Sequence, residues 1–366
     1  METLRKKKLK FYNRIGVFCS ELKTPKIKAD FYSKPEDFIV EELHSKFKCT
    51  VEKNNLTPVI KYNKKYIHAT LVKKNLSTFE CCEIIARENQ IPLKEISFCG
   101  LKDTFGLTAQ RICIRNIRPL TKTLFPNFFL KDFSDSDQKL SLRNHLGNSF
   151  KIKIKNISVP TKECVEYLKK IKEKSKNGFP NFYGPQRFGK NQNLHQIGKL
   201  IVKRKFKEAY SKFLINSKIS KGKMINKQTQ NDFIEILRTE KSFIFAINSY
   251  SSYLWNLALS KWLSKNKNIK NIKIFKIGSN IKPREIERKF YLPILKKEGV
   301  KFSDFNFPIK EFNIKTHLRN ILFYPRNFQF KCEKNFLLLT FDLGAGEYTS
   351  LFLDFIFDNR KGIKLE

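Results

Sequence analysis

Alternating apolar and polar positions mark several short strands along the chain. The clearest is 150–155, where Phe and Ile alternate with Lys, so that a strand would present Ile on one face and Lys on the other. Runs of β-branched and aromatic residues predict further strands at 37–41, 67–72, 96–99 and 111–115. A similar run at 337–341 is expected to rejoin the same sheet.

A helical period appears between these strands. Ser77 and Glu80 have the spacing of a capping box, which predicts a helix that begins just after Ser77. The buried face of that helix is expected to consist of Phe79, Cys82, Ile85 and Ala86. Val165, Leu168 and Ile171 predict a second amphipathic helix, which should end close to Gly178.

The texture of the sequence divides the chain into three parts. Residues 1–25 are basic and poor in pattern, and they predict a mobile arm. Residues 26–190 and 316–366 carry the strand-like runs and predict one α/β (α+β) domain. Residues 191–315 have helical periodicity, many lysines and polar connections, which predict a smaller, mostly helical inserted domain.

A polar loop at 100–110 connects two of the predicted strands. Its glycines, Gly100 and Gly106, let the backbone turn sharply and can aim Asp103 away from the sheet. The neighbouring Lys102 would keep that carboxylate ionised at neutral pH. A Lys-Asp pair in a turn is more often simply solvated, since Asp favours turns through local hydrogen bonds. The loop by itself therefore does not establish a catalytic role.

The segment 178–189 is too irregular for a helix or a strand interior, with three glycines, two prolines and four aromatic residues. Aromatic side chains on such a backbone, with Arg187 nearby, are suited to stacking an unpaired base and holding its phosphate. The same residues could equally form a buried aromatic plug. The segment leaves both interpretations open.

Composition adds one strong feature, a large positive charge. The 366 residues include 73 Lys and Arg against 34 Asp and Glu, a formal net charge of +39. Such a surface favours polyanionic partners, with nucleic acid first. The joint abundance of Lys, Asn, Ile and Phe also fits an AT-rich coding sequence, so codon bias is an alternative source of part of the charge.

Other classes of protein fit the sequence less well. No run of about 18 apolar residues could span a bilayer. The first residues lack the apolar segment of a secretory signal, so we expect an intracellular protein, cytoplasmic, or nuclear if the source is eukaryotic. The eight cysteines include no C-x-x-C pair, which predicts buried free thiols and no metal site.

Four motifs in order resemble the TruD family of RNA pseudouridine synthases. They are Pro35-Glu36-Asp37-Phe38-x-Val40-x-Glu42, Gly100-x-Lys102-Asp103 with Thr108 and Gln110, Gly147-Asn148-x-Phe150, and Asn181-Phe182-Tyr183-Gly184-x-Gln186-Arg187-Phe188-Gly189. Weaker matches are Lys73 with Thr78, residues 252–256, Arg319 before Tyr324-Pro325, and Gly346-x-Tyr348-Thr349. The resemblance spans nearly the whole chain.

This resemblance implies an isomerase that converts uridine in RNA to pseudouridine without cofactor or metal. The family breaks the N1–C1′ bond and rejoins the base through C5, and the motif match makes Asp103 the catalytic carboxylate. An anion can stabilise or capture the cationic sugar of such a reaction, and whether Asp103 acts as nucleophile or base stays open. The implied fold is a V-shaped catalytic domain with a mixed, largely antiparallel sheet and a family-specific insertion.

The resemblance also implies which residues hold the RNA. A flipped-out uridine needs a pocket, which Phe38, Asn181, Tyr183 and Tyr348 are expected to line. Asn181 would hold the uracil edge or order its loop, and Tyr183 stands where the family usually has Phe. The remaining expected substrate-binding residues are Lys102, Lys34, Gln110, Arg187 and Arg319.

Some positions depart from the family pattern. Thr104 replaces a usual Lys or Arg, Gly106 a usual Ala, and Asp354-Phe355 a usual Arg-Glu. We expect a monomeric synthase acting on tRNA, with its charge concentrated near Asp103 and on the insertion. The alternatives are an RNA-binding protein or chaperone that keeps the fold with weak turnover, and a basic protein without a nucleic-acid role.

Overall fold

The computed structural model describes residues 4–22, 27–31, 33–57, 63–100, 102–140, 145–217, 242–266 and 269–359. Its strands are β1 Ile27–Ala29, β2 Phe38–His44, β3 Tyr66–Lys74, β4 Ile96–Phe98, β5 Leu107–Arg115, β6 Phe128–Ser136, β7 His145–Ile154, β8 Phe179–Pro180, β9 Lys273–Lys276, β10 His317–Asn320, β11 Leu322–Phe323, β12 Arg326–Cys332, β13 Leu337–Gly344 and β14 Phe357–Asn359. Its helices are α1 Leu4–Arg14, α2 Thr78–Glu88, α3 Thr161–Ser175, α4 Leu194–Val202, α5 Phe206–Ser217, α7 Ser242–Lys265, α8 Glu285–Glu298 and α9 Thr349–Ile356.

One eight-stranded mixed sheet connects most of the chain. Its order is β12-β13-β7-β2-β5-β3-β6, with β4 paired to β5. Only the pairing of β2 with β5 is parallel, so the sheet is largely antiparallel as expected. The predicted run at 337–341 does rejoin it, because β13 pairs with β7 along eight residues from Leu337 to Gly344.

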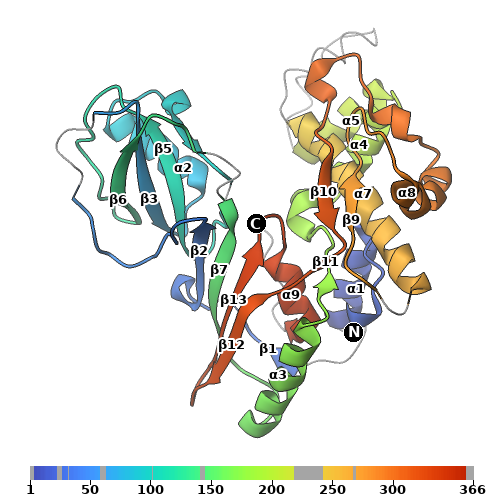
Figure 1. The fold of residues 1–366 in the computed structure, drawn as a ribbon, viewed down its shortest axis with the longest axis horizontal. Coiled ribbons are helices and arrows are strands. Elements are labelled where there is room, and N and C mark those ends of the chain that lie inside the picture. The colour runs from blue at the N-terminus through green and yellow to red at the C-terminus, as the bar shows by residue number, and fades with distance from the viewer. Residues whose placement is uncertain are drawn as a thin grey trace.

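Two lobes diverge from this sheet and give the molecule its V shape (Figure 1). The sheet lobe consists of β3, β4, β5, β6 and α2, and the helical lobe consists of α4, α5, α7 and α8. Within the described part of 191–315, helices α4, α5, α7 and α8 account for most of the regular structure, beside the short strand β9. The boundaries of 191–315 as a separate domain stay a prediction, since Trp255 and Ile197 belong to the same hydrophobic cluster as Leu339 of the sheet.

Helix α2 covers one face of the sheet lobe. The capping box is confirmed, because the Ser77 hydroxyl accepts from the Glu80 amide at 3.1 Å and the Glu80 carboxylate accepts from the Ser77 amide at 2.7 Å. The predicted buried face was wrong at Phe79, which is 54% exposed and packs edge-on against Phe98. A neighbouring face of α2 packs against the sheet instead. The buried residues of the helix are Thr78, Cys81, Cys82, Ile85 and Ala86.

The prediction of a mobile N-terminal arm was wrong. Residues 4–14 form α1, and the end of this segment is buried through Tyr12, Ile15 and Val17. The Tyr12 hydroxyl donates to the carboxylate of Asp354 in α9, and Lys8 forms an ion pair with the same carboxylate at 2.5 Å. The many basic residues of this segment hid the apolar pattern in the sequence. Burial of these few apolar side chains holds the segment in place.

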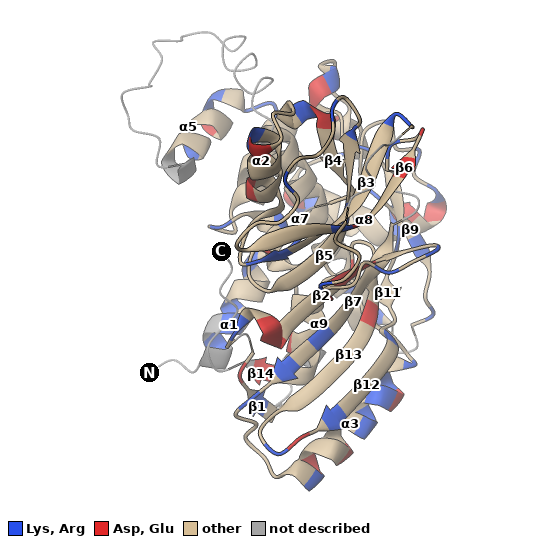
Figure 2. Ribbon diagram, turned by 90° about the vertical axis from the view of Figure 1, so that its left-hand side faces the viewer, with Lys and Arg blue, Asp and Glu red and all other residues tan. Residues whose placement is uncertain are grey.

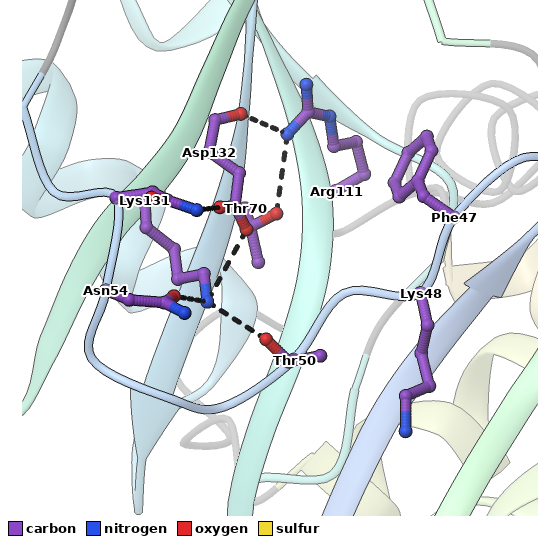
Figure 3. Close-up of a pocket in the computed structure, with 9 residues that line it drawn as sticks. Phe47, Lys48, Thr50, Asn54, Thr70, Arg111, Lys131 and Asp132 are labelled. Carbon is purple, nitrogen blue, oxygen red and sulfur yellow. Dashed lines mark hydrogen bonds and ion pairs between the residues drawn. The ribbon is translucent and has the colours of Figure 1, made fainter.

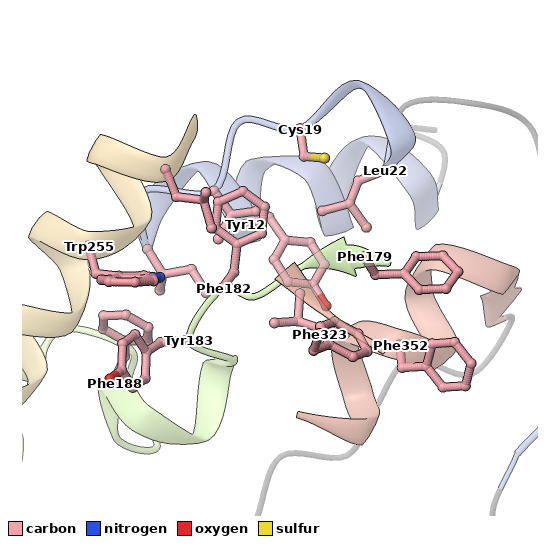
Figure 4. Packing of buried hydrophobic residues seen from close by; sticks show 14 of the residues in the cluster. Tyr12, Cys19, Leu22, Phe179, Phe182, Tyr183, Phe188, Trp255, Phe323 and Phe352 are labelled. Carbon is pink, nitrogen blue, oxygen red and sulfur yellow. The ribbon is translucent and has the colours of Figure 1, made fainter. Parts of the chain in front are cut away.

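A large aromatic cluster lies where α1, α7, α9 and the 178–189 segment meet (Figure 4). Phe179, Phe182 and Phe188 are each at most 1% exposed, which confirms the aromatic plug for these three side chains. The cysteines also behave as expected, since all eight are free thiols and seven are buried. Within the described ranges, none of the helices is long and apolar enough to cross a bilayer.

Lysine and arginine are distributed over many elements rather than gathered on one. Figure 2 shows basic positions on α1, α3 and the strands at the base of the V as well as on the lobes. Helix α3, for example, carries several lysines and lies outside the insertion. The expected concentration of charge near Asp103 and on the insertion therefore stays a prediction.

The contacts of Asp354 predict a stability effect. Asp354→Ala should lower the free energy of unfolding by about 1–3 kcal/mol, because it leaves the buried Tyr12 hydroxyl without its acceptor. Urea unfolding measures the change. Glu173→Ala, which breaks an exposed ion pair with Lys176, is the control and should cost less than about 0.5 kcal/mol. Equal stability of Asp354→Ala and the parent protein would contradict the assignment.

Candidate active site

Asp103 lies on the loop between β4 and β5, and its side chain is exposed. Gly106, near the end of this loop, has a φ of +123°, and a Cβ atom there would lie 2.7 Å from the carbonyl oxygen of Phe38. A residue larger than glycine would therefore push against β2. This close approach brings the buried Phe38 next to the loop that carries Asp103, as the resemblance implies.

Two buried polar side chains hold the start of the loop. The Gln110 amide donates to the Gly100 carbonyl at 3.0 Å and its oxygen accepts from the Thr78 hydroxyl at 2.8 Å. The Thr78 hydroxyl in turn accepts from the Lys102 amide at 3.3 Å. Gln110 is fully buried, so the structure places it as a residue that shapes the loop and not at the solvent-facing surface.

Lys73 fixes the loop at Asp103 itself. Its ammonium is 1% exposed and donates to the carbonyl oxygens of Asp103 at 2.6 Å and of Leu76 at 2.7 Å. Burial lowers the pKa of Lys73 to about 8, although the nearby Asp103 opposes this. In the sequence, Lys73 was only a weak motif match. Nothing in its spacing indicated that it would form a hydrogen bond with the Asp103 backbone.

Opposing effects act on the Asp103 carboxyl group. Desolvation by the surrounding protein raises its pKa above the usual value, while the charges of Lys73 and Lys102 lower it. Because the side chain is exposed to solvent, we expect the two lysines to limit the rise and the carboxylate to be ionised at neutral pH.

Lys102 points into the protein, and its expected role in substrate binding stays a prediction. Its ammonium forms an ion pair with Glu42 of β2 at 2.5 Å, and both side chains are buried. Burial raises the pKa of Glu42, but a hydrogen bond from His44 and the charge of Lys102 outweigh it and bring the pKa to about 2. Lys102 is thus a second attachment of the loop, and its partner Glu42 is a motif residue whose contact the sequence did not predict.

Lys34 lies on the surface before β2. Its backbone amide donates to the Asp37 carboxylate at 3.1 Å, and its charge helps to lower the pKa of Glu36 after the larger effect of Lys74. In the described part of the chain, no hydrogen bond or ion pair joins its side chain to Asp103. Its expected role in substrate binding stays a prediction.

Asn181 orders the segment 178–189. Its side-chain amide donates to the Asn320 carbonyl at 2.9 Å, and its oxygen accepts from Arg319 at 2.5 Å. Arg319 also donates to the carbonyls of Phe182 and Gly346, at 3.3 and 3.0 Å, so it joins this segment to the residues before α9. Of the two roles expected for Asn181, loop ordering is the one that its contacts describe.

Tyr183 lies at the centre of this region. Asn256 of α7 holds its backbone on both sides, accepting from the amide at 2.8 Å and donating to the carbonyl at 3.0 Å. Arg319 stacks on its ring at 4.1 Å, and Tyr348 meets it edge-on with ring centres 6.0 Å apart. The structure therefore brings together Tyr183, Tyr348 and Arg319 as the motifs implied.

A separate polar pocket of about 340 Å³ lies at β3, β5 and β6 (Figure 3). Arg111 lines it and donates to the Asp132 carbonyl at 2.6 Å, and Lys131 lines it with an Asp132 ion pair at 3.5 Å. The Arg111 backbone reaches Glu42 at 3.4 Å, which connects the pocket to the Lys102–Glu42 ion pair. No sequence motif pointed to this pocket. Among the described residues, no group of His, Cys, Asp or Glu could hold a metal ion.

The lysine contacts predict how Asp103 titrates. Lys73→Met should raise the pKa of the Asp103 carboxyl group, because a nearby cation that favours the ionised form is removed. NMR titration of the labelled carboxyl carbon measures it. Lys131→Met, another buried lysine whose partners are Asp132 and the 50–54 loop, should leave the Asp103 pKa unchanged. A lower or unchanged pKa in Lys73→Met would contradict this arrangement.

Comparison with known proteins identifies the family. A family model described as tRNA pseudouridine synthase D (TruD) matches residues 14–243. The probable tRNA pseudouridine synthase D of Picrophilus torridus is 29% identical over 291 residues, covering 70% of this chain and 66% of its own length. The multisubstrate pseudouridine synthase 7 of Schizosaccharomyces pombe is 32% identical over 154 residues, covering 39% of this chain and 22% of its own length.

A solved structure shows the same fold. The crystal structure of the putative tRNA pseudouridine synthase D of Methanosarcina mazei matches with a TM-score of 0.65 at 20% identity, and covers 96% of this chain and 98% of that chain. The alignments with the curated relatives, in contrast, span about two thirds of the Picrophilus protein and less of the yeast protein. Because the family model covers more than half of the chain, the protein belongs to the tRNA pseudouridine synthase D (TruD) family.

Proposed function

We propose that the protein is an RNA pseudouridine synthase that isomerises uridine in tRNA, with Asp103 as its catalytic carboxylate. The observation that carries the proposal is the form of the Asp103 loop. The exposed Asp103 carboxylate lies on a loop whose backbone is held at two places. Lys73 donates to the Asp103 carbonyl, and Gln110 and Thr78 bond the backbone at the start of the loop. Relatives of the chain bear the name tRNA pseudouridine synthase D, which supports tRNA as the substrate.

The chemistry needs a positioned anion and little else from the protein. The N1–C1′ bond of the uridine breaks, the C5–C1′ bond forms, and the proton lost from C5 is balanced by one gained at N1. An ionised carboxylate can stabilise or capture the sugar cation at C1′ in the manner of glycosidases. A fixed loop lowers the entropic cost of placing that carboxylate against C1′.

The uridine must leave the RNA stack to reach Asp103. We place its pocket between Phe38, which lies against the loop, and the pair Tyr183 and Tyr348. Arg187, Arg319 and Lys34 are proposed to hold the RNA around this pocket. We further propose that residues 191–315 act as an RNA-binding insertion and that the protein works as a monomer inside the cell.

The departures from the family pattern leave the Asp103 support intact. Thr104 follows Asp103 on the exposed part of the loop, and Gly106 fits the tight contact with Phe38. Asp354 replaces a family residue and contacts Lys8 and Tyr12 of α1, at the other end of the chain. These features favour a working synthase over an RNA-binding protein that has lost turnover.

Release of tritium from RNA labelled at uridine C5 tests the proposal. The parent protein should release label, and Asp103→Asn should reduce the rate by at least about 10²–10⁴, because the anion at C1′ is lost. Asp137→Asn, an exposed carboxylate in the sheet lobe, is the matched control and should keep the parental rate. Undiminished release by Asp103→Asn would overturn the assignment of Asp103.

Mapping of pseudouridine in RNA from cells with and without the protein names the modified position. Loss of one or more tRNA pseudouridines is the expected result. RNA binding without any such change would instead support the chaperone-like alternative.

A further inference from the structure

Three cationic side chains surround the ring of Tyr183. The Arg319 guanidinium lies 4.1 Å from the ring centre, the Lys276 ammonium 5.6 Å and the Arg187 guanidinium 5.8 Å. Lys276 comes from β9, outside every motif that the sequence displayed. We call these three residues the Tyr183 cation cluster.

Lys276 is the unusual member of the cluster. It is fully buried, and its ammonium makes only long contacts, 3.4 Å to the Asn248 carbonyl and 3.3 Å to the Asn248 side-chain oxygen. The same Asn248 oxygen accepts from Arg187 at 3.2 Å, so one amide connects the two cations. Burial, together with the charges of Arg187 and Arg319, lowers the pKa of Lys276 well below its usual value.

No carboxylate among the described residues forms an ion pair with any member of the cluster. The nearest acidic influence is Glu347, which acts on Arg319 but accepts a hydrogen bond from the Gly344 amide at 2.7 Å. Other buried cations are matched: Lys102 has Glu42 at 2.5 Å, and Lys131 has Asp132 at 3.5 Å together with three oxygen acceptors. The Tyr183 cation cluster is therefore a group of cationic side chains without its own counter-ion, in which the buried Lys276 holds its proton less tightly than an ordinary lysine.

We propose that the Tyr183 cation cluster binds one backbone phosphate of the RNA substrate. Arg187 makes the contact: it is half-buried, and it uses one N–H toward Ser252 and one toward Asn248, which leaves three guanidinium hydrogens for an oxygen ligand. Lys276 and Arg319 supply charge from behind the ring. The proposal rests on the proposed function, because it places the phosphate beside the pocket for the flipped uridine.

A phosphate suits this site for two physical reasons. An anion bound at the cluster would compensate the two guanidinium charges and favour the protonated form of Lys276, and the protein supplies no carboxylate of its own here. Guanidinium groups bind phosphate oxygens through paired N–H donors, which lysine alone cannot do. His317, at the edge of the cluster, adds no positive charge at neutral pH, since desolvation of its ring and the charge of Lys276 lower its pKa to about 4.

The salt dependence of tRNA binding tests the cluster. All variants carry Asp103→Asn, so that binding is measured without turnover and independently of whether the parent protein is a synthase. Each lost phosphate contact should reduce the slope of log Kd against log salt by about 0.7–0.9. We expect this reduction, with a several-fold weaker Kd, in Arg187→Gln, which removes the contact itself. Lys276→Met should weaken Kd several-fold, because it removes charge beside the contact. Because one phosphate is involved, the double variant should lose no more slope than Arg187→Gln alone.

Two controls keep the result interpretable. Lys131→Met removes a lysine that is similarly buried but ion-paired, and it should leave the slope unchanged. Circular dichroism and thermal unfolding of every variant confirm that it is folded, and the half-buried Arg187 gives a second variant if Lys276→Met is unstable. A folded Arg187→Gln with the parental slope, or a folded Lys276→Met with the parental Kd, would overturn the proposal.

Inorganic phosphate separates the two sources of the anion. If the site recognises RNA, millimolar phosphate should compete only weakly with tRNA and should not raise the thermal stability of the protein. Strong stabilisation by inorganic phosphate that is lost in Lys276→Met, with no change in the tRNA slope, would assign the cluster to a free anion and overturn the RNA site.

Discussion

The bond from the buried Lys73 ammonium to the Asp103 carbonyl is the contact on which the site depends. Lys73 belongs to β3, which is hydrogen-bonded on both sides, to β5 and to β6, so its position is fixed by the sheet. This hydrogen bond ties the loop backbone to the sheet, while the Asp103 side chain remains available to a substrate. The Lys102–Glu42 ion pair adds a second attachment to β2.

The buried cations of this protein fall into two kinds. Lys73, Lys102 and Lys131 each face carbonyl oxygens or a carboxylate, so their burial is compensated and they serve to hold backbone segments in place. Lys276 faces an amide oxygen at long distance and two other cations. The difference matters because a buried lysine without a counter-ion either gives up its proton or gains a ligand of opposite sign. The same physical rule therefore separates structural lysines from a binding site.

Local signals predicted elements well where the pattern depends on neighbouring residues alone. The strand at 150–155, the capping box at Ser77 and the irregular segment 178–189 all appear as expected. The prediction failed where distant partners decide. Residues 4–22 are held in place through contacts of Tyr12 with Asp354 and of Ile15 with Asn256 of α7. Phe79 points outward because a neighbouring face of α2 packs against the sheet.

The sequence by itself predicted the main strands and helices, Asp103 as the candidate catalytic carboxylate and the motif residues around it. It could do so because spacing and turn chemistry are local properties. Only the tertiary structure decided what each polar side chain faces. Gln110, Lys102 and Arg319 support backbone from within, and Lys276 joins the site from a strand that no motif marks. These outcomes depend on which strands lie side by side, and the pairing of residues far apart in the chain is not encoded in any short window of sequence.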